Sequence, residues 1–461
     1  MRGSAAATGA YLLVVLTFGA YLPSTLYPAY QQDFGAGDLT MTLVYATFAL
    51  VSAPALVLFG QAADVVGPRP VLRGAVVVAA AGSASFVFAS DIGWLVAGRA
   101  AQGLALGAAT AAASSLTAVH AGRRVDGAAL AGIAFVGGTA AGPVVGGLMA
   151  RYVPAPETVP FAVHLVLLAV GWRLVSRLGT TASGMTVAPV GAPHRAWRPT
   201  VPRIPRETRR LFVSAAVTGF LAWTVAGLFL AIIPTLLERS GPADPAVTGA
   251  ILGSVLLCSV ATQPLVGRVG VRGAQIAGAA ALLTSLVVLA VNAGGSTATT
   301  LAAAVIAGVG HGLAYGGASA AVDAVAPVAH KGAITGALHV AFYLGSGCPA
   351  VVVGLITLVH PLPTATSWVA AAAAIGTVGA AASVVAMQRP ATAPEGPIVA
   401  FNATMGPSGA TRGVRRAPAE RVEGRCPAAG APRTLLSAGA QAGGRQRMTV
   451  TSPDSSSSPA P

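Results

Sequence analysis

Long uncharged stretches dominate the first 388 residues of the chain. Ten long, predominantly apolar stretches contain no Asp, Glu, Lys or Arg, and they lie at 3–32, 39–63, 74–90, 100–122, 127–150, 158–172, 211–237, 245–267, 273–322 and 332–388. A bilayer core about 30 Å thick is crossed by roughly 20 helical residues, so most stretches hold one spanning helix. The last two hold two helices each, because turn-forming sequences at 292–297 and 360–363 interrupt them. The pattern predicts an all-α membrane protein with twelve transmembrane helices.

Composition and charge agree with a membrane location. Apolar residues make up 54% and charged residues 9% of the chain, and the mean hydropathy is +0.72. Soluble domains carry about 25% charged residues. The net charge of +14 comes from arginines in the tail and between the predicted spans, not on one amphipathic face, so we expect no nucleic-acid partner.

The basic residues also predict the orientation in the membrane. Most basic residues outside the tail lie in alternate loops, which the positive-inside rule places in the cytoplasm. Examples are Arg69, Arg124, Arg173 and Arg272. We therefore expect a multi-pass protein of the cell (plasma) membrane with both termini cytoplasmic. The opposite loops are acidic, with two basic exceptions, Arg151 and Arg239.

The helices fall into two sets of six. We expect an N-terminal half at 1–176, a cytoplasmic linker at 177–210, a C-terminal half at 211–388 and a disordered basic tail at 389–461. The halves repeat weakly, since 101–109 resembles 310–318 and 66–69 resembles 269–272. Duplicated six-helix units are typical of transporters, in which two repeats rock about a site near the bilayer midplane.

The loop after the second helix contains Gly60, Asp64, Gly67 and Arg69. Their spacing resembles the signature loop of the major facilitator superfamily. The resemblance covers roughly residues 10–388, and it implies that these four residues form a conformational lock at the cytoplasmic helix ends. Val65 and Pro68 replace basic residues common in that loop, so the lock should be weaker. An ordinary turn with a solvated Asp64 is the alternative.

The fourth predicted helix contains two polar residues, Arg99 and Gln102. An arginine in a transmembrane helix is costly and usually faces a polar cavity or a partner. The pair resembles the fourth-helix motif of the superfamily, which implies a role in the proton or substrate pathway. The alternative is an arginine that extends its head group to the membrane interface.

The fifth helix carries Gly138, Gly142, Pro143, Gly146 and Gly147. Three of these glycines share one helical face and would allow close packing of another helix, which is also the structural alternative. The whole string resembles the fifth-helix motif of twelve-span drug exporters that work by proton antiport.

Further candidates for the proton or substrate pathway lie in both halves. Tyr21 and Tyr27 alternate with prolines in the first helix, where interfacial anchoring is the alternative. His311 and Tyr315, and likewise His339 and Tyr343, lie one turn apart, although a buried histidine can equally be a neutral hydrogen-bonded residue. Asp323 is the one carboxylate within the predicted helices of the second half.

No metal-ligand cluster, phosphate-binding loop or catalytic triad is recognisable, so we expect neither an enzyme nor a cofactor. The sequence favours a monomeric secondary active transporter that exports small hydrophobic or amphipathic compounds, with protons as coupling ion and the lipid bilayer as its surroundings. A transporter of a sugar or another polar metabolite is the alternative. A membrane sensor that signals through its tail without moving cargo is a further one.

Overall fold

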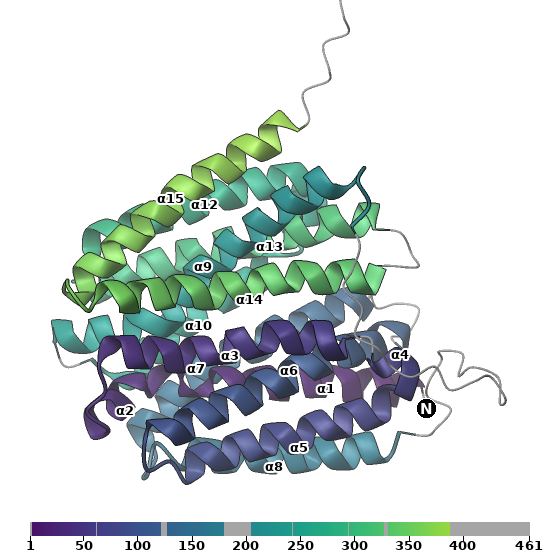
Figure 1. The fold of residues 1–461 in the computed structure, drawn as a ribbon, viewed down its shortest axis with the longest axis horizontal. Coiled ribbons are helices and arrows are strands. Elements are labelled where there is room, and N and C mark those ends of the chain that lie inside the picture. Colours follow the sequence, from purple (N-terminus) through teal and green to yellow (C-terminus); the bar gives the residue numbers. More distant parts are fainter. Residues whose placement is uncertain are drawn as a thin grey trace, which may run out of the picture. The chain divides into compact units, whose positions relative to one another are not determined.

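Helices make up the regular structure of the described residues in this computed structural model (Figure 1). The description covers residues 2–60, 62–120, 127–178, 204–241, 243–293, 295–326 and 331–387, all within one compact unit, Met1–Pro394. The first part of the chain forms α1 (Arg2–Tyr21), the 3₁₀ helix η1 (Leu22–Thr25), α2 (Tyr27–Asp33), α3 (Asp38–Phe59), α4 (Ala62–Val66), α5 (Pro68–Val87), α6 (Ile92–His120), α7 (Gly127–Tyr152) and α8 (Val159–Ser176). The second part forms α9 (Arg209–Ser240), α10 (Pro245–Thr262), α11 (Leu265–Val269), α12 (Val271–Asn292), α13 (Thr297–Val325), α14 (Lys331–Ile356) and α15 (Leu362–Ala386).

The predicted all-α membrane fold is confirmed. Within the described residues, 11 helices are long and apolar enough to cross a membrane. The remaining predicted span is α6, whose 29 residues correspond to about 43 Å of helix. Arg99, Gln102 and many small residues lower its hydropathy, yet it packs against α1, α3 and α5 like the other spans. The twelve predicted segments are thus all long helices.

The same sequence of elements occurs in both parts of the chain. A long helix is followed by a five-residue helix and a glycine with positive φ, as α3, α4 and Gly67, and again as α10, α11 and Gly270. The two glycines have φ/ψ of 86°/157° and 80°/155°, a conformation that residues with a Cβ rarely adopt. The weak sequence repeat at 66–69 and 269–272 therefore corresponds to one repeated backbone turn.

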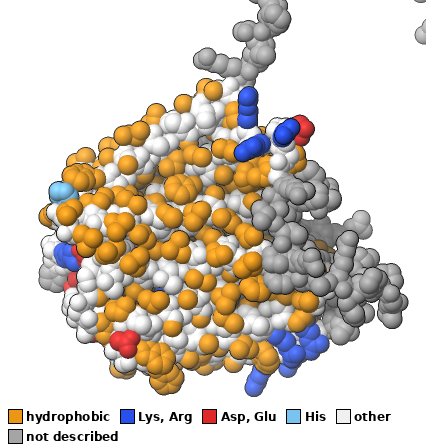
Figure 2. Space-filling model, viewed as in Figure 1, with side chains coloured by type: hydrophobic (Ala, Val, Ile, Leu, Met, Phe, Trp, Pro, Cys, Tyr) orange, Lys and Arg blue, Asp and Glu red, His pale blue; other side chains and the backbone are white. Residues whose placement is uncertain are grey.

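The most extensive packing between the first part of the chain and the second is that of α3 against α14 and of α7 against α10. Figure 2 shows a face rich in hydrophobic side chains, with most of the visible Lys and Arg at the end where Figure 1 marks the N-terminus. Exposed apolar side chains along long helices are what a lipid environment requires. The predicted linker and tail lie largely outside the described residues.

Candidate functional site

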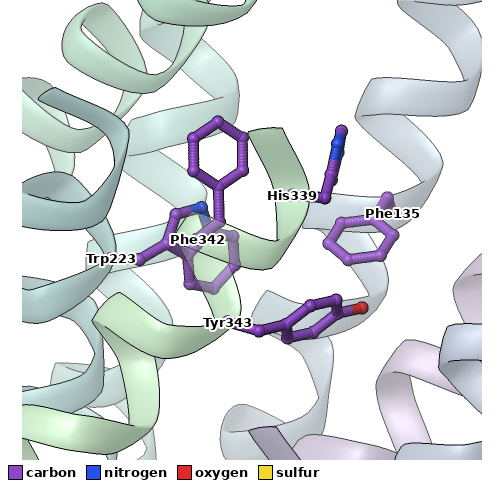
Figure 3. Close-up of a pocket in the computed structure, with 5 residues that line it drawn as sticks. All are labelled: Phe135, Trp223, His339, Phe342 and Tyr343. Atoms are coloured by element: carbon purple, nitrogen blue, oxygen red, sulfur yellow. The ribbon is translucent and has the colours of Figure 1, made fainter. Parts of the chain in front are cut away.

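A cavity lies between helices of the first and second parts of the chain (Figure 3). It is lined by Phe135 of α7, Trp223 of α9, and His339, Phe342 and Tyr343 of α14, and its free volume is about 10 Å³, room for about one water molecule. Figure 3 shows Trp223 and Phe342 on one side and Phe135 on the other. Four of the five rings are more than nine-tenths buried, so the lining is apolar and rigid.

Aromatic contacts continue from the cavity in two directions. In the second part of the chain, the rings of His311 and Tyr315 stack at 5.5 Å, and Trp223 packs edge-on against His311 at 4.9 Å. Toward the first part, Tyr343 contacts Phe48 at 6.1 Å, and Phe48 contacts Tyr21 at 5.4 Å. The predicted residues therefore belong to two ring clusters that meet at the cavity: His311, Tyr315 and His339 in one, and Tyr21 and Tyr343 in the other.

Arg99 lies behind the cluster of Tyr21 and Tyr343 and is fully buried, with 0% exposure. Its guanidinium donates to the carbonyls of Ala20 and Tyr45 and to Gln102 Oε1, the last at 3.0 Å, and its Cζ lies 4.6 Å from the centre of the Phe48 ring. An arginine that reaches for the membrane interface keeps its head group exposed, so that alternative does not fit this geometry. The described part of the chain supplies no carboxylate within ion-pair distance of Arg99.

A break in the first helix explains why this arginine finds carbonyl partners. Pro23 has no N–H, so it cannot bond the Gly19 carbonyl one turn earlier, and the chain changes to a 3₁₀ turn at Leu22. Gln102 Nε2 donates to that Gly19 carbonyl at 3.0 Å. Arg99 and Gln102 therefore satisfy backbone groups that the proline break leaves open, as polar residues commonly do in membrane helices.

The remaining predicted residues of the second part occupy two kinds of place. His311 is fully buried, with Nδ1 2.8 Å from Ser259 Oγ and no hydrogen-bond partner for Nε2 among the described residues. His339 lines the cavity, and its Nδ1 lies 2.8 Å from the Thr335 carbonyl. Asp323 is close enough to His339 for their charges to interact.

Tyr27 is buried in the first part of the chain, and its ring packs edge-on against Tyr45 at 6.3 Å. Tyr45 in turn shares a 2.8 Å hydrogen bond with Ser346 of α14. Four residues of this region were not predicted from the sequence, because single aromatic or hydroxyl residues in apolar helices do not indicate a site: Tyr45, Ser346, Phe135 and Phe342.

A second buried histidine, His164, was also overlooked. Its ring lies 2.6 Å from Ser83 Oγ and 3.0 Å from the Val15 carbonyl, so it connects α8 to α5 and α1. The carbonyl can only accept, so Nε2 carries the hydrogen and the Ser83 hydroxyl donates to Nδ1. A polar residue within the uncharged stretch 158–172 was the available signal.

The predicted lock residues lie around α4. Gly60 ends α3, and Gly67 adopts its positive-φ turn before α5. Arg69 donates to the Ser176 carbonyl at the end of α8, at 2.8 Å, where the helix dipole favours a cation. The Asp64 side chain lies outside the described residues, so its predicted charge contact stays a prediction.

The glycine string of α7 contacts two different helices. Gly138, Gly142 and Gly146 pack against α1 and η1, and a Cβ added at Gly146 would lie 2.6 Å from the Leu22 carbonyl. Gly147 faces α10 instead, where an added Cβ would lie 2.9 Å from Gly249 Cα. Pro143 lies inside α7. The string thus positions both the broken first helix and the α7–α10 contact.

Two ion pairs among the described residues connect the two parts of the chain. Arg239, at the end of α9, forms a bidentate pair with Asp38, at the start of α3, with distances of 2.5 and 3.0 Å. Arg151, at the end of α7, lies 3.4 Å from Asp244, which precedes α10. These two arginines are the basic exceptions on the side predicted to face outward.

A carboxyl group on the same side, that of Glu157, has a raised pKa. Glu157 lies in the loop between α7 and α8, where partial burial and the neighbouring Asp33 carboxylate raise its pKa from 4.5 to about 7. Removal from water and a like charge both favour the neutral form.

A bundle of apolar helices with repeated elements and a cavity between its two parts is typical of a secondary transporter. The Major Facilitator Superfamily profile matches residues 9–348, and the chain belongs to this family. It is therefore a multi-pass membrane protein of a family that binds and transports small molecules and is typically not enzymatic. No curated protein matches the chain significantly. The described residues contain no group of three or more His, Cys, Asp or Glu side chains arranged to hold a metal.

Proposed function

We propose that this transporter exports small hydrophobic or amphipathic compounds across the plasma membrane in exchange for protons. The observation that carries the proposal is the aromatic lining of the cavity. Aromatic rings contribute large apolar contact area, and no carboxylate, amide or basic side chain other than His339 lines the space. The five residues offer three hydrogen-bonding groups, on Trp223, His339 and Tyr343, which is fewer than the hydroxyls of a sugar would require.

The ion pairs support an alternating-access cycle. Asp38–Arg239 and Arg151–Asp244 each hold a helix end of the first half against one of the second half, on the side that charge bias predicts to be extracellular. These pairs must separate when the cavity opens to that side. They therefore offer a contact that distinguishes the two states of the cycle.

The direction of transport is inferred from α7. Its glycine string resembles the motif of proton-coupled exporters, and its contacts are specific to glycine, since added Cβ atoms would meet backbone of α1, η1 or α10. Export driven by the proton gradient needs a group that binds a proton within reach of the cargo, and His339 and Asp323 lie in that region.

Flux in inverted membrane vesicles tests the proposal. With an acid interior, vesicles that contain the transporter should accumulate an uncharged aromatic dye such as N-phenyl-1-naphthylamine and should alkalinise inside as it enters. Control vesicles carry Arg99→Ala, which removes the charge that holds α1, α3 and α6 together. Accumulation that is the same without a pH gradient would refute proton coupling, and uptake of sugars but not of apolar dyes would favour the polar-metabolite alternative.

A further inference from the structure

The tautomer of His339 is fixed by its backbone contact. The Thr335 carbonyl, 2.8 Å from Nδ1, can only accept a hydrogen bond, so Nδ1 carries the hydrogen. In the neutral ring, Nε2 then keeps a free lone pair. Because His339 lines the cavity, this lone pair is a proton acceptor beside the cargo space.

Asp323 provides a second acceptor in the direction of the cytoplasm. It lies in the last turn of α13, is exposed, and interacts electrostatically with His339. A proton that leaves the ring can therefore pass to a carboxylate near the helix end that charge bias places inside the cell. The aromatic rings of the cavity provide no comparable acceptor.

The elements packed around α14 contain few competing groups. Tyr45 of α3 is committed to Ser346. His311 and Tyr315 of α13 stack on each other and contact the lining ring of Trp223, and His311 Nδ1 is held by Ser259. Helix α9 contributes Trp223 beside the cavity, while its charged residues lie at its ends. Helix α15 has no charged or titratable residue, and Tyr343 shares α14 with His339. Arg99 lies behind Phe48 and stays bonded to carbonyls.

We propose that His339 is the proton-binding residue of the antiport cycle, and that it couples transport because its protonated ring and an apolar cargo exclude each other from the cavity. This inference rests on the proposed export function. When the cavity opens outward, Nε2 takes up one proton. The resulting imidazolium requires water or polar partners, which an apolar cargo would displace, so the cargo leaves.

The cycle closes on the inner side. Once the cavity opens to the cytoplasm, the proton moves from Nε2 to Asp323 and on to water, and the neutral ring again permits apolar cargo to bind. One proton thus enters for each cargo molecule that leaves, with no bond formed to the cargo.

Probe binding coupled to proton release tests the assignment in the purified full chain. Binding of N-phenyl-1-naphthylamine in weakly buffered detergent should release a proton in the pH range where the ring is protonated, and its affinity should fall up to about tenfold for each unit of acidification below the ring's titration. At probe concentrations that saturate binding, His339→Gln should show neither proton release nor pH-dependent affinity.

A matched control is available in His120, whose Nδ1 lies 3.1 Å from the carbonyl four residues earlier but which does not line the cavity. His120→Gln should behave like the parent. His339→Asn serves as the second variant if the glutamine protein elutes as aggregate. Unchanged proton release in either His339 variant would overturn the assignment, and so would probe binding without proton release in the parent. A parent that neither binds nor transports the probe would instead overturn the proposed function.

Discussion

The Asp38–Arg239 ion pair offers a direct test of how the side predicted to face outward closes. Arg239→Ala removes a bidentate contact between α9 and α3 while Asp38 keeps its 2.7 Å hydrogen bond from Gln31. We expect the outward-open state to become more populated, because the closed state alone contains this pair. The helices themselves should be unaffected, since both residues lie at helix ends.

The size of the effect follows from exposure and geometry. The Arg239 side chain is 47% exposed and that of Asp38 15%. Exposed ion pairs contribute about 0.2–1 kcal/mol, and bidentate geometry favours the upper half of that range. About 0.5–1 kcal/mol corresponds to roughly a two- to fivefold change in the ratio of open to closed molecules. The Arg151–Asp244 pair is longer and more exposed, at 56% and 40%, so Arg151→Ala should have the smaller effect.

Cysteine labelling measures this ratio. Thr42 is buried near the outer end of α3 against Gly354 of α14, so Thr42→Cys in a chain without its 3 native cysteines reports on opening between these helices. A membrane-impermeant maleimide added outside should react about two to five times faster with the Arg239→Ala protein.

Charge reversal and an inner-side control complete the test. Combining Asp38→Arg with Arg239→Asp should return the labelling rate toward that of the parent, because the pair is restored with opposite polarity. Arg173→Ala, at the inner end of α8, should leave the rate unchanged. Equal labelling of parent and Arg239→Ala, or fast labelling of the reversed pair, would refute the reasoning.

Three further perturbations test other parts of the structure. Gly138→Ala should destabilise the protein by about 1–3 kcal/mol through its clash with α1, whereas Gly137→Ala, with no heavy atom within 4 Å of the new Cβ, should leave the melting temperature unchanged. Arg99→Lys should lower transport almost as much as Arg99→Ala, since one ammonium group cannot span the carbonyls of two helices; a lysine variant with parental flux would contradict this. The raised pKa of Glu157 means that its stabilising neutral form is present at low pH and is lost as the pH rises from 4.5 through about 7, so Glu157→Gln should flatten the decline of the melting temperature between pH 5 and pH 8. An equally steep decline in the glutamine variant would show that other groups cause it.

The spans could be predicted from the sequence alone, because a helix that crosses lipid must be apolar over roughly 20 residues. The sequence also located the turn at Gly67 and its repeat at Gly270, since both need a residue without a Cβ. No such rule of composition applies to the predicted linker at 177–210. The orientation, the exact lock contacts and the proton carrier stay predictions.

Contacts between distant segments were beyond the sequence. Asp38 and Arg239 are 201 positions apart, and Arg239 was recognised as a basic exception but without its partner. Phe135 and Trp223 lie in separate helices and meet only through the packing of α7, α9 and α14. The role of Pro23 could be predicted in part, because a proline within a helix leaves one carbonyl without its backbone partner. Which side chain donates to that carbonyl depends on the neighbouring helix.

The crossing of α7 and α10 has a consequence for how the two halves move. At Gly147 and Gly249 the main chains approach each other with no side chain between them, while Val144 of α7 packs against Gly253 of α10 nearby. A close main-chain contact of this kind can act as a pivot, which keeps the distance between the halves constant while their tilt changes. Bulk at either glycine would therefore impair the speed of the cycle more than the affinity for cargo.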